Sequence, residues 1–252
     1  IGGMGIVVFY IAVLPLLGVG GIQLFKAEVP GPVADKIKPR VRETAKFLWI
    51  IYVGITSIEI IALRIAGMET FDSICHAFTT MPTGGFSTKN ASLAYYDNPM
   101  IHYIIIFFMF LAGINFSLHF HAMSGSIKTY FRDTEFLVYF LIIISISSII
   151  FFSLSYQSNR ISDQTLRESL FGTIAMLTGT GYVLGDYEIW PVFLQMILLT
   201  LMFVGGMGGS TTGGMKVIRV LLLVKYAALE TRRMLHSRAL LPVKIGKQLI
   251  KE

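Results

Sequence analysis

The sequence of 252 residues is 54% hydrophobic and only 14% charged, with a mean hydropathy of +0.68. Soluble domains carry roughly 25% charged residues, so this composition excludes an ordinary soluble domain and indicates a membrane protein. A net charge of +6 would suggest nucleic-acid binding in a soluble protein. In a membrane protein the positive-inside rule explains such an excess, and we expect no nucleic-acid partner. The single cysteine, Cys75, excludes an intrachain disulfide.

The first apolar run, residues 1–25, has the length of a membrane helix, and Pro15 predicts a kink near its end. Because the run is already apolar at Ile1, we expect the chain to be a piece of a longer protein, cut within a helix. A polar, proline-containing linker covers residues 26–46. The second span is predicted over residues 47–67.

A helix too short to cross a bilayer follows. Residues 71–81 would rise about 16 Å as a helix, half of a hydrocarbon core, and Pro82 ends it. A polar loop is predicted over residues 89–99. The third span is predicted as one helix over residues 100–121.

The second half of the chain has the same order of elements. We expect a basic loop at 124–133, a span at 134–156, a polar loop at 157–167, a half-helix at 170–177, an acidic loop at 186–190, a last span at 191–224 interrupted by 205–215, and a basic tail at 225–252. A half-helix followed by an extended glycine-bearing segment, placed between two spans, is typical of a pore loop.

The two glycine-bearing segments align when Gly85 is set against Gly181, which pairs Phe86 with Tyr182. Carbonyls that replace the hydration shell of a cation must point the same way, and this requires backbone conformations that glycine adopts readily. We expect Phe86 and Tyr182 to pack outward and hold the segments. The candidate ion-binding residues are Thr83, Gly84, Gly85, Phe86, Gly179, Thr180, Gly181 and Tyr182. The alternative is an ordinary interhelical turn, which does not explain two aligned segments.

Charge placement predicts the topology. If both half-helices enter from outside, the inner segments hold seventeen of the 21 Lys and Arg residues. The outer mouths then carry acidic residues that would concentrate cations: Glu69, Asp72, Asp97, Asp163, Glu168, Asp186 and Glu188.

The glycine-rich stretch at 205–215 interrupts the last span. It lacks the lysine and the preceding strand of a phosphate-binding loop, because Gly214 stands where the lysine must be. A broken helix must line a cavity to satisfy its backbone, although tight helix packing through small residues is the alternative. The candidate gate residues are Gly205, Gly206, Gly208, Gly209, Ser210, Thr211, Thr212, Gly213 and Gly214.

Internal repetition supports a unit of helix, half-helix, glycine segment and helix. The sequence GGMG at 2–5 recurs at 205–208, and FLAGIN at 110–115 aligns with FVGGMG at 203–208. The period is about 95 residues. The chain holds two complete units and the last helix of a preceding one, whereas enclosing a pore takes about four such units.

The motifs together resemble the Trk/Ktr/HKT potassium transporter superfamily, and most of all its bacterial Trk-type membrane subunits. The matching segments are TGGFST at 83–88, TGTGYV at 178–183, GGMG at both ends, LFKAEVPGP at 24–32 and GGSTTGGMKVIR at 208–219. The resemblance covers essentially the whole chain. It implies an all-α membrane protein, built of potassium-channel-like helix–pore-helix–helix repeats around one pore.

The resemblance also implies function and partners. It implies potassium uptake across the bacterial cytoplasmic (inner) membrane, sometimes with sodium as in a symport. Potassium would be the transported ion, with no cofactor and no enzyme activity. The glycine-rich stretch would be an intramembrane gating loop. A homodimer and a cytosolic nucleotide-binding ring are the implied partners, beside the lipid bilayer.

The repeats divide the chain into four parts: 1–39, the last helix of a preceding repeat and a cytoplasmic linker; 40–127, a second repeat; 128–224, a third repeat with a broken final helix; and 225–252, a basic cytoplasmic segment leading to a fourth repeat. The basic segment could contact lipid headgroups or the cytosolic ring.

Two alternatives remain open at this point. An ion-coupled secondary transporter with broken helices would use Glu59, a charge inside the second span, as its coupling residue. A purely structural membrane subunit would tolerate alanine at Gly85 and Gly181. Three polar residues of the third span, Asn115, His119 and His121, either touch permeating ions or bond to neighbours. His76 and Cys75 have no metal-site spacing, and we expect no metal there.

Overall fold

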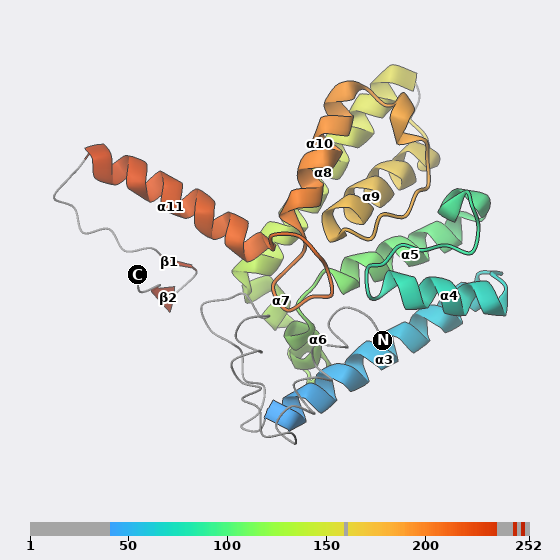
Figure 1. Cartoon of the computed structure of the whole chain (residues 1–252), viewed down its shortest axis with the longest axis horizontal. Helices are drawn as coiled ribbons and strands as arrows, with labels where there is room; N and C mark the ends of the chain where they lie inside the picture. The colour runs from blue at the N-terminus through green and yellow to red at the C-terminus, as the bar shows by residue number, and fades with distance from the viewer. Residues whose placement is uncertain (1–40, 159–160, 236–243, 246–247, 250–252) are drawn as a thin grey trace.

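The computed structural model describes residues 41–158, 161–235, 244–245 and 248–249. The expected helix and linker over 1–39 lie outside these residues. The described chain is helical apart from one short antiparallel ladder (Figure 1). The helices are α3 Val41–Ile65, α4 Thr70–Thr80, α5 Pro99–Ala112, α6 Phe116–Met123, α7 Lys128–Arg132, α8 Thr134–Ser158, α9 Asp163–Thr178, α10 Val192–Val204 and α11 Val217–Leu235, with 3-10 turns η2 Ser92–Tyr95 and η3 Tyr187–Ile189; the ladder pairs β1 Lys244–Ile245 with β2 Gln248–Leu249.

The first half-helix forms where it is predicted. Helix α4 covers Thr70–Thr80 with Met81 as its C-cap, and it packs against α3 and α5. Its inner face is buried, while Phe71 and Phe78 on the other face are exposed. This face lies where lipid or another part of a larger assembly would cover it.

The second half-helix is longer than predicted. Helix α9 begins at Asp163, within the expected polar loop 157–167, because the side chain of Ser162 caps it by accepting from the amide of Thr165 at 3.1 Å. It ends at Gly179, whose φ of 70° is left-handed and closes the helix. Helix α9 packs against α5, α8 and α10, so it lies at the centre of the described bundle.

The prediction of one continuous third span is wrong. The chain breaks after α5, and α6 departs from the direction of α5 by 101°. Asn115 starts α6, because its side chain accepts from the amide of Ser117 at 2.8 Å. Carbonyls left free by the break are used by the glycine-rich loop, as described below.

The chain is interrupted at the predicted place, because α10 ends at Val204 and α11 begins at Val217. The expected end of the last span at 224 is wrong: α11 continues to Leu235, inside the expected basic tail, and projects away from the other helices (Figure 1). Among the described helices, Lys46–Ile65 and Thr134–Gln157 are each long and apolar enough to cross a membrane, and the bent pair α5 and α6 makes a third candidate. Large apolar side chains on these helices face outward, as a bilayer requires: Ile58, Ile61, Phe107, Phe140 and Phe152.

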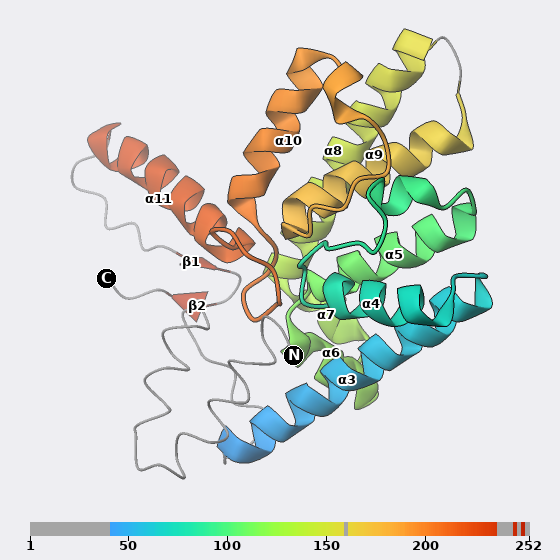
Figure 2. The ribbon, with the colours of Figure 1, turned by 45° about the vertical axis from the view of Figure 1, so that its right-hand side comes forward.

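The two half-helices end close together. Figure 2 shows the segments that leave α4 and α9 passing one another between the two helices. Backbone contacts join them further along, because the amide of Leu93 donates to the carbonyl of Val183 at 3.1 Å. Segments about 95 residues apart in the sequence therefore meet in one place.

Candidate functional site

The segment after α4 turns its carbonyls away from the helix. The amides of Thr83, Gly84 and Gly85 donate back to the carbonyls of Thr80 and Thr79 at 2.7–3.1 Å. In a trans peptide the carbonyl points opposite to the amide of the next residue. The carbonyls of Pro82, Thr83 and Gly84 therefore point away from the end of α4.

The segment after α9 is built in the same way. The amide of Gly179 donates to the carbonyl of Met176 at 3.2 Å, and that of Gly181 donates to the carbonyl of Ala175 at 3.1 Å. By the same geometry the carbonyls of Thr178 and Thr180 point away from the helix. Gly179 and Gly181 have φ of 70° and 76°, which glycine adopts without strain.

Gly85 lies directly against the second segment. It has a φ of 65°, and a Cβ atom built on it would overlap the carbonyl oxygen of Thr180. A side chain is therefore excluded at Gly85 by two independent effects. At Gly181 only the backbone conformation disfavours one, because the space around it is open. Each segment follows the C-terminal end of its half-helix, where the helix dipole favours a cation.

Tyr182 anchors the second segment on the first half-helix. Its side chain is fully buried, and its hydroxyl lies 2.6 Å from the hydroxyl of Thr79 and donates to the carbonyl of His76 at 3.1 Å. Thr79 in turn donates to the carbonyl of Phe86 at 2.7 Å. The expected anchoring role of Tyr182 is thus visible in its contacts.

Phe86 behaves differently from its aligned partner. It is 76% exposed, so the expectation that it packs and holds its segment is not met among the described residues. The physical reason lies in the neighbours: Tyr182 packs on α4 and bonds to Thr79 and His76, whereas none of the described residues covers the Phe86 ring.

Asp72, one of the acidic residues expected at the outer mouth, is paired. Its carboxylate lies 3.2 Å from the Lys89 ammonium and accepts from Thr88 at 2.7 Å and Tyr96 at 2.8 Å. Burial raises the pKa of Asp72, but these three partners outweigh it, so that the pKa falls below its ordinary value. The Asp72 carboxylate raises the pKa of Lys89 in return.

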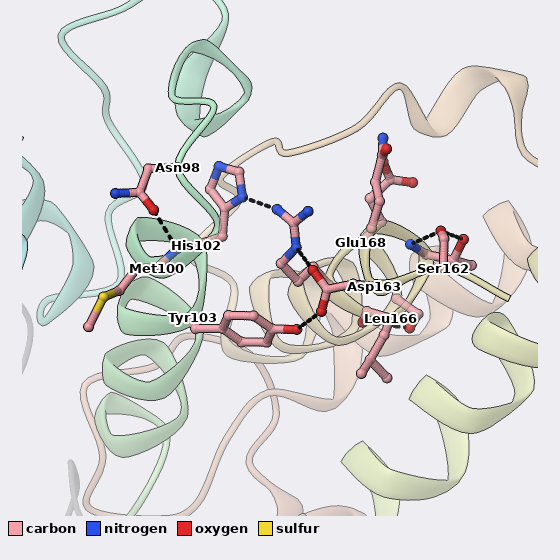
Figure 3. Close-up of polar contacts among 12 residues, drawn as sticks. Asn98, Met100, His102, Tyr103, Ser162, Asp163, Leu166 and Glu168 are labelled. Atoms are coloured by element: carbon pink, nitrogen blue, oxygen red, sulfur yellow. Dashed lines mark hydrogen bonds and ion pairs between the residues drawn. The ribbon is translucent and has the colours of Figure 1, made fainter. Parts of the chain in front are cut away.

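A second polar cluster joins α5 to the start of α9. Figure 3 shows Tyr103 reaching from α5 to Asp163, which accepts from Tyr103 at 2.6 Å and from Arg167 at 2.8 Å. These two donors lower the pKa of Asp163. Arg167 also donates to Nδ1 of His102 at 2.8 Å. A cavity of about 210 Å³ lies beside the cluster, lined by Ala94, Tyr96, Asp97, His102, Gln164, Arg167, Glu168 and Leu184.

The glycine-rich loop docks on the break between α5 and α6. The amide of Met207 donates to the carbonyl of Gly113 at 2.9 Å, and the hydroxyl of Thr211 donates to that of Ala112 at 3.1 Å. The amide of Phe116 returns a bond to the carbonyl of Gly209 at 3.1 Å. Each broken helix therefore supplies partners for the other.

Several positions of this loop have no room for a side chain, which explains why they are glycines. Gly205 and Gly214 have φ of 76° and 77° and lie against one another, with a Cβ on Gly214 only 2.9 Å from the Cα of Gly205. A Cβ on Gly206 would come within 2.9 Å of the Gly113 carbonyl oxygen. The hydroxyl residues of the loop, Ser210, Thr211 and Thr212, are all buried.

The loop also touches the first glycine segment. The hydroxyl of Thr83 donates to the carbonyl of Thr211 at 3.1 Å, as well as lying 2.7 Å from the carbonyl of Pro82. Sequence reasoning placed both segments in one pore but did not predict this contact. It also missed Glu135, whose carboxylate accepts from the amides of Gly208 at 2.7 Å and Ile218 at 3.1 Å.

The other polar residues singled out in the sequence have local partners. Asn115 caps α6, and His119 bonds to the carbonyl of Leu111 at 3.1 Å and to the hydroxyl of Tyr130 at 2.7 Å. His76 bonds to the carbonyl of Asp72 at 2.7 Å and to the hydroxyl of Ser87 at 2.9 Å. These contacts favour hydrogen bonding between neighbours for Asn115 and His119.

Glu59 differs from the other polar residues singled out in the sequence, and it is one of several buried side chains with polar atoms that lack a hydrogen-bond partner within the described part of the chain. Its side chain is fully buried in α3, and the Thr80 side chain is the polar group that interacts with its carboxylate. Among the described residues, no hydrogen bond of ordinary length and angle reaches either carboxylate oxygen. Over the same residues no three His, Cys, Asp or Glu side chains gather as metal ligands would.

Comparison with known proteins agrees with this architecture. The family described as "TrkH: Cation transport protein" matches residues 1–252. The Trk system potassium uptake protein TrkH of Escherichia coli (strain K12) is 44% identical over 100% of this chain and 53% of its own length. TrkG of the same strain is 37% identical over 99% of this chain and 52% of its own length.

A solved structure shows the same fold. The potassium transporter TrkH from Vibrio parahaemolyticus superposes with a TM-score of 0.81 at 38% identity, covering 97% of this chain and 50% of that one. The chain spans about half the length of the relatives it matches. It is an all-helical membrane protein that belongs to the TrkH family of cation transport proteins.

Proposed function

We propose that this chain is part of the pore-forming subunit of a potassium uptake system in the bacterial inner membrane. Potassium ions would pass between the carbonyls of residues 83–86 and 179–182. The observation that carries the proposal is the meeting of these two segments, with their amides turned back to the half-helices and Gly85 against the Thr180 carbonyl. The relatives, described as Trk system potassium uptake proteins, support potassium as the ion.

The glycine-rich loop at 205–215 is the proposed gate. It lies beside the first glycine segment, because the Thr83 hydroxyl reaches the Thr211 carbonyl. Its contacts with α5 and α6 are single backbone and hydroxyl hydrogen bonds, each worth about 1 kcal/mol net. Such a loop can leave its position at modest cost and without unfolding a helix.

The exposure of Phe86 supports a larger ring of repeats. Tyr182 is buried on α4, the half-helix of the unit before its own, whereas Phe86 has no such cover among the described residues. We therefore propose that 40–127 and 128–224 are the second and third of four repeats, and that the half-helix of the first repeat covers Phe86. Neither unit would conduct by itself.

The implied partners form a further part of the proposal. We propose a homodimer that binds a cytosolic nucleotide-binding ring. Helix α11 carries Arg219 and Lys225 and projects away from the other helices, so it is the described element best placed for a contact on the cytosolic side (Figure 1).

The proposal is tested by uptake of tracer rubidium in cells that lack their own potassium uptake and express the full-length parent. Gly181→Ala places a side chain at a φ of 76° that costs about 1–2 kcal/mol, and we expect uptake to collapse or sodium to enter. Gly54→Ala is the matched control, because Gly54 is exposed in α3 and has open space around it.

Wild-type uptake and selectivity in Gly181→Ala, at equal membrane expression, would contradict the filter. The segment would then be an ordinary turn, and the coupled-transporter alternative with Glu59 would take precedence.

A further inference from the structure

Glu135 joins three elements that meet at the inner end of α8. It lies in the first turn of that helix, and its Oε1 atom accepts from the amide of Gly208 at 2.7 Å and from the amide of Ile218 at 3.1 Å. Gly208 belongs to the glycine-rich loop, and Ile218 belongs to the first turn of α11. A single carboxylate oxygen thus bridges the beginning of the loop and the helix that follows it.

The geometry of these bonds sets them apart from the other contacts of the loop. Each contact of the loop with α5 and α6 joins one donor to one acceptor, whereas the Oε1 atom of Glu135 accepts from two backbone amides at once. The first amides of a helix have no partner within it, so an acceptor placed there satisfies one of them. Glu135 therefore caps α11 from a neighbouring helix.

The bond between Glu135 and the amide of Ile218 restrains movement of the loop because of where Ile218 lies. Ile218 follows the loop directly, so any displacement of 205–215 that carries α11 along must break the bond at Ile218. A displacement of the loop alone must break the bond at Gly208. Either movement requires Glu135 to release a backbone amide.

We propose that Glu135 is the positioning residue that holds the glycine-rich loop in its observed place, so that release of its two amide bonds accompanies opening. This inference rests on the proposed gating function of 205–215. The loop would thus be restrained by a side chain outside it, because Glu135 belongs to α8.

The test uses the full-length parent, reconstituted in proteoliposomes without cytosolic partners, and measures open probability and rubidium flux. Glu135→Ala removes the acceptor, and we expect about a tenfold rise in basal open probability with unchanged selectivity for potassium over sodium. Glu135→Gln keeps an oxygen at the same distance from the backbone, and we expect it to stay within about twofold of wild type.

Asp133→Ala is the matched control. Asp133 carries the neighbouring carboxylate and directly precedes α8, where it accepts from the amide of Phe136 at 2.8 Å. Its removal weakens the start of α8 without removing the bonds to Gly208 and Ile218, so basal open probability should not change. A rise equal to that of Glu135→Ala would overturn the proposal, because fraying of α8 would then be the cause.

A second readout follows the loop directly. In a Cys75→Ser background, Ser210→Cys places a thiol at a buried loop position. We expect a water-soluble thiol reagent to modify it several-fold faster when Glu135 is Ala than when it is Gln. Equal modification rates in the Glu135→Ala and Glu135→Gln proteins would overturn the proposal. The comparison is made on folded protein, so it stays decisive if Glu135→Ala lowers the yield.

Failure of this inference is distinguishable from failure of the gate. A full-length parent with 208–213 shortened to two glycines should show raised basal flux if the loop gates. Unchanged flux in that variant contradicts the gate itself. Raised flux there, with wild-type behaviour in Glu135→Ala, contradicts only the role of Glu135.

Discussion

The hydroxyl of Thr83 donates a hydrogen bond to the carbonyl of Thr211 across 3.1 Å, although the two residues are 128 positions apart. Thr83 lies in the first glycine segment with a φ of 56°, and Thr211 lies buried in the glycine-rich loop. The candidate filter and the candidate gate therefore touch through one side chain, so movement of the loop must alter the surroundings of the filter.

Thr83→Val tests this contact. Valine keeps the shape and the branched Cβ but has no donor, so the Thr211 carbonyl loses its bond and the loop is held less firmly. We expect basal rubidium flux in the full-length parent to rise several-fold, in keeping with a loss of about 1 kcal/mol. Thr83→Ser keeps the hydroxyl and should match wild type. Equal flux in both variants would show that the contact does not restrain the loop.

The two filter glycines should differ in their tolerance of alanine. Gly181→Ala meets only a strained backbone, whereas Gly85→Ala also meets the Thr180 carbonyl, so one segment must move. We expect Gly85→Ala to lower the free energy of unfolding more than Gly181→Ala, by about 1–3 kcal/mol, which is the typical cost of forcing extra atoms into filled space. Thermal unfolding of the purified parent, compared with Gly54→Ala, measures the difference. The reverse order would contradict the close approach of Gly85 to Thr180.

Tyr182→Phe should loosen the second segment. The change removes a buried hydroxyl that meets Thr79 and the His76 carbonyl, and we expect a loss of about 1–3 kcal/mol of stability with reduced selectivity against sodium. Tyr156→Phe is the control, because Tyr156 is 89% exposed. Competition of sodium with rubidium uptake measures selectivity. Wild-type selectivity in Tyr182→Phe would mean that the segment is held by other contacts.

The pairing of Asp72 predicts that acid destabilises the contacts around the start of α4. The pKa of Asp72 is lower in the folded protein than its ordinary value near 4, so the pairing contributes full stability above about pH 4. That contribution is lost as the pH falls through the depressed folded value. We expect melting temperatures of the parent to drop below about pH 4 by more than those of Asp72→Asn. Parallel pH profiles for the two proteins would contradict the prediction.

Glu59→Leu separates the two transport mechanisms. A buried polar group without a partner destabilises a fold, so its replacement by an apolar side chain of similar volume should raise the melting temperature. Under the channel-like proposal rubidium uptake should stay within about twofold of wild type. If Glu59 couples transport to another ion, uptake should collapse although the protein is more stable. The two mechanisms therefore predict opposite results for uptake.

The sequence by itself determined the membrane class, the half-helices and the glycine segments. These features are local: apolar runs of about 20 residues predict spans, Pro82 limits α4, and glycines mark backbone that no other residue adopts easily. The break at 205–215 could be predicted for the same reason. The alignment of 110–115 with 203–208 held a signal of the second break, after α5, because Gly113 and Asn115 match positions where the last span is interrupted.

Only the tertiary structure decided which groups meet. The sequence motifs mark several of these residues but not their partners. The contacts that depend on the fold are the bond from Thr83 to Thr211, the packing of Tyr182 on α4, the bridge from Glu135 to Gly208 and Ile218, and the pairing of Asp72. Most of these hydrogen bonds end on a backbone amide or carbonyl. Every residue has a backbone carbonyl, and all but proline have an amide, so the sequence does not mark which of them will be the partner. Composition and periodicity therefore cannot reveal them until the chain has brought the two half-helices together.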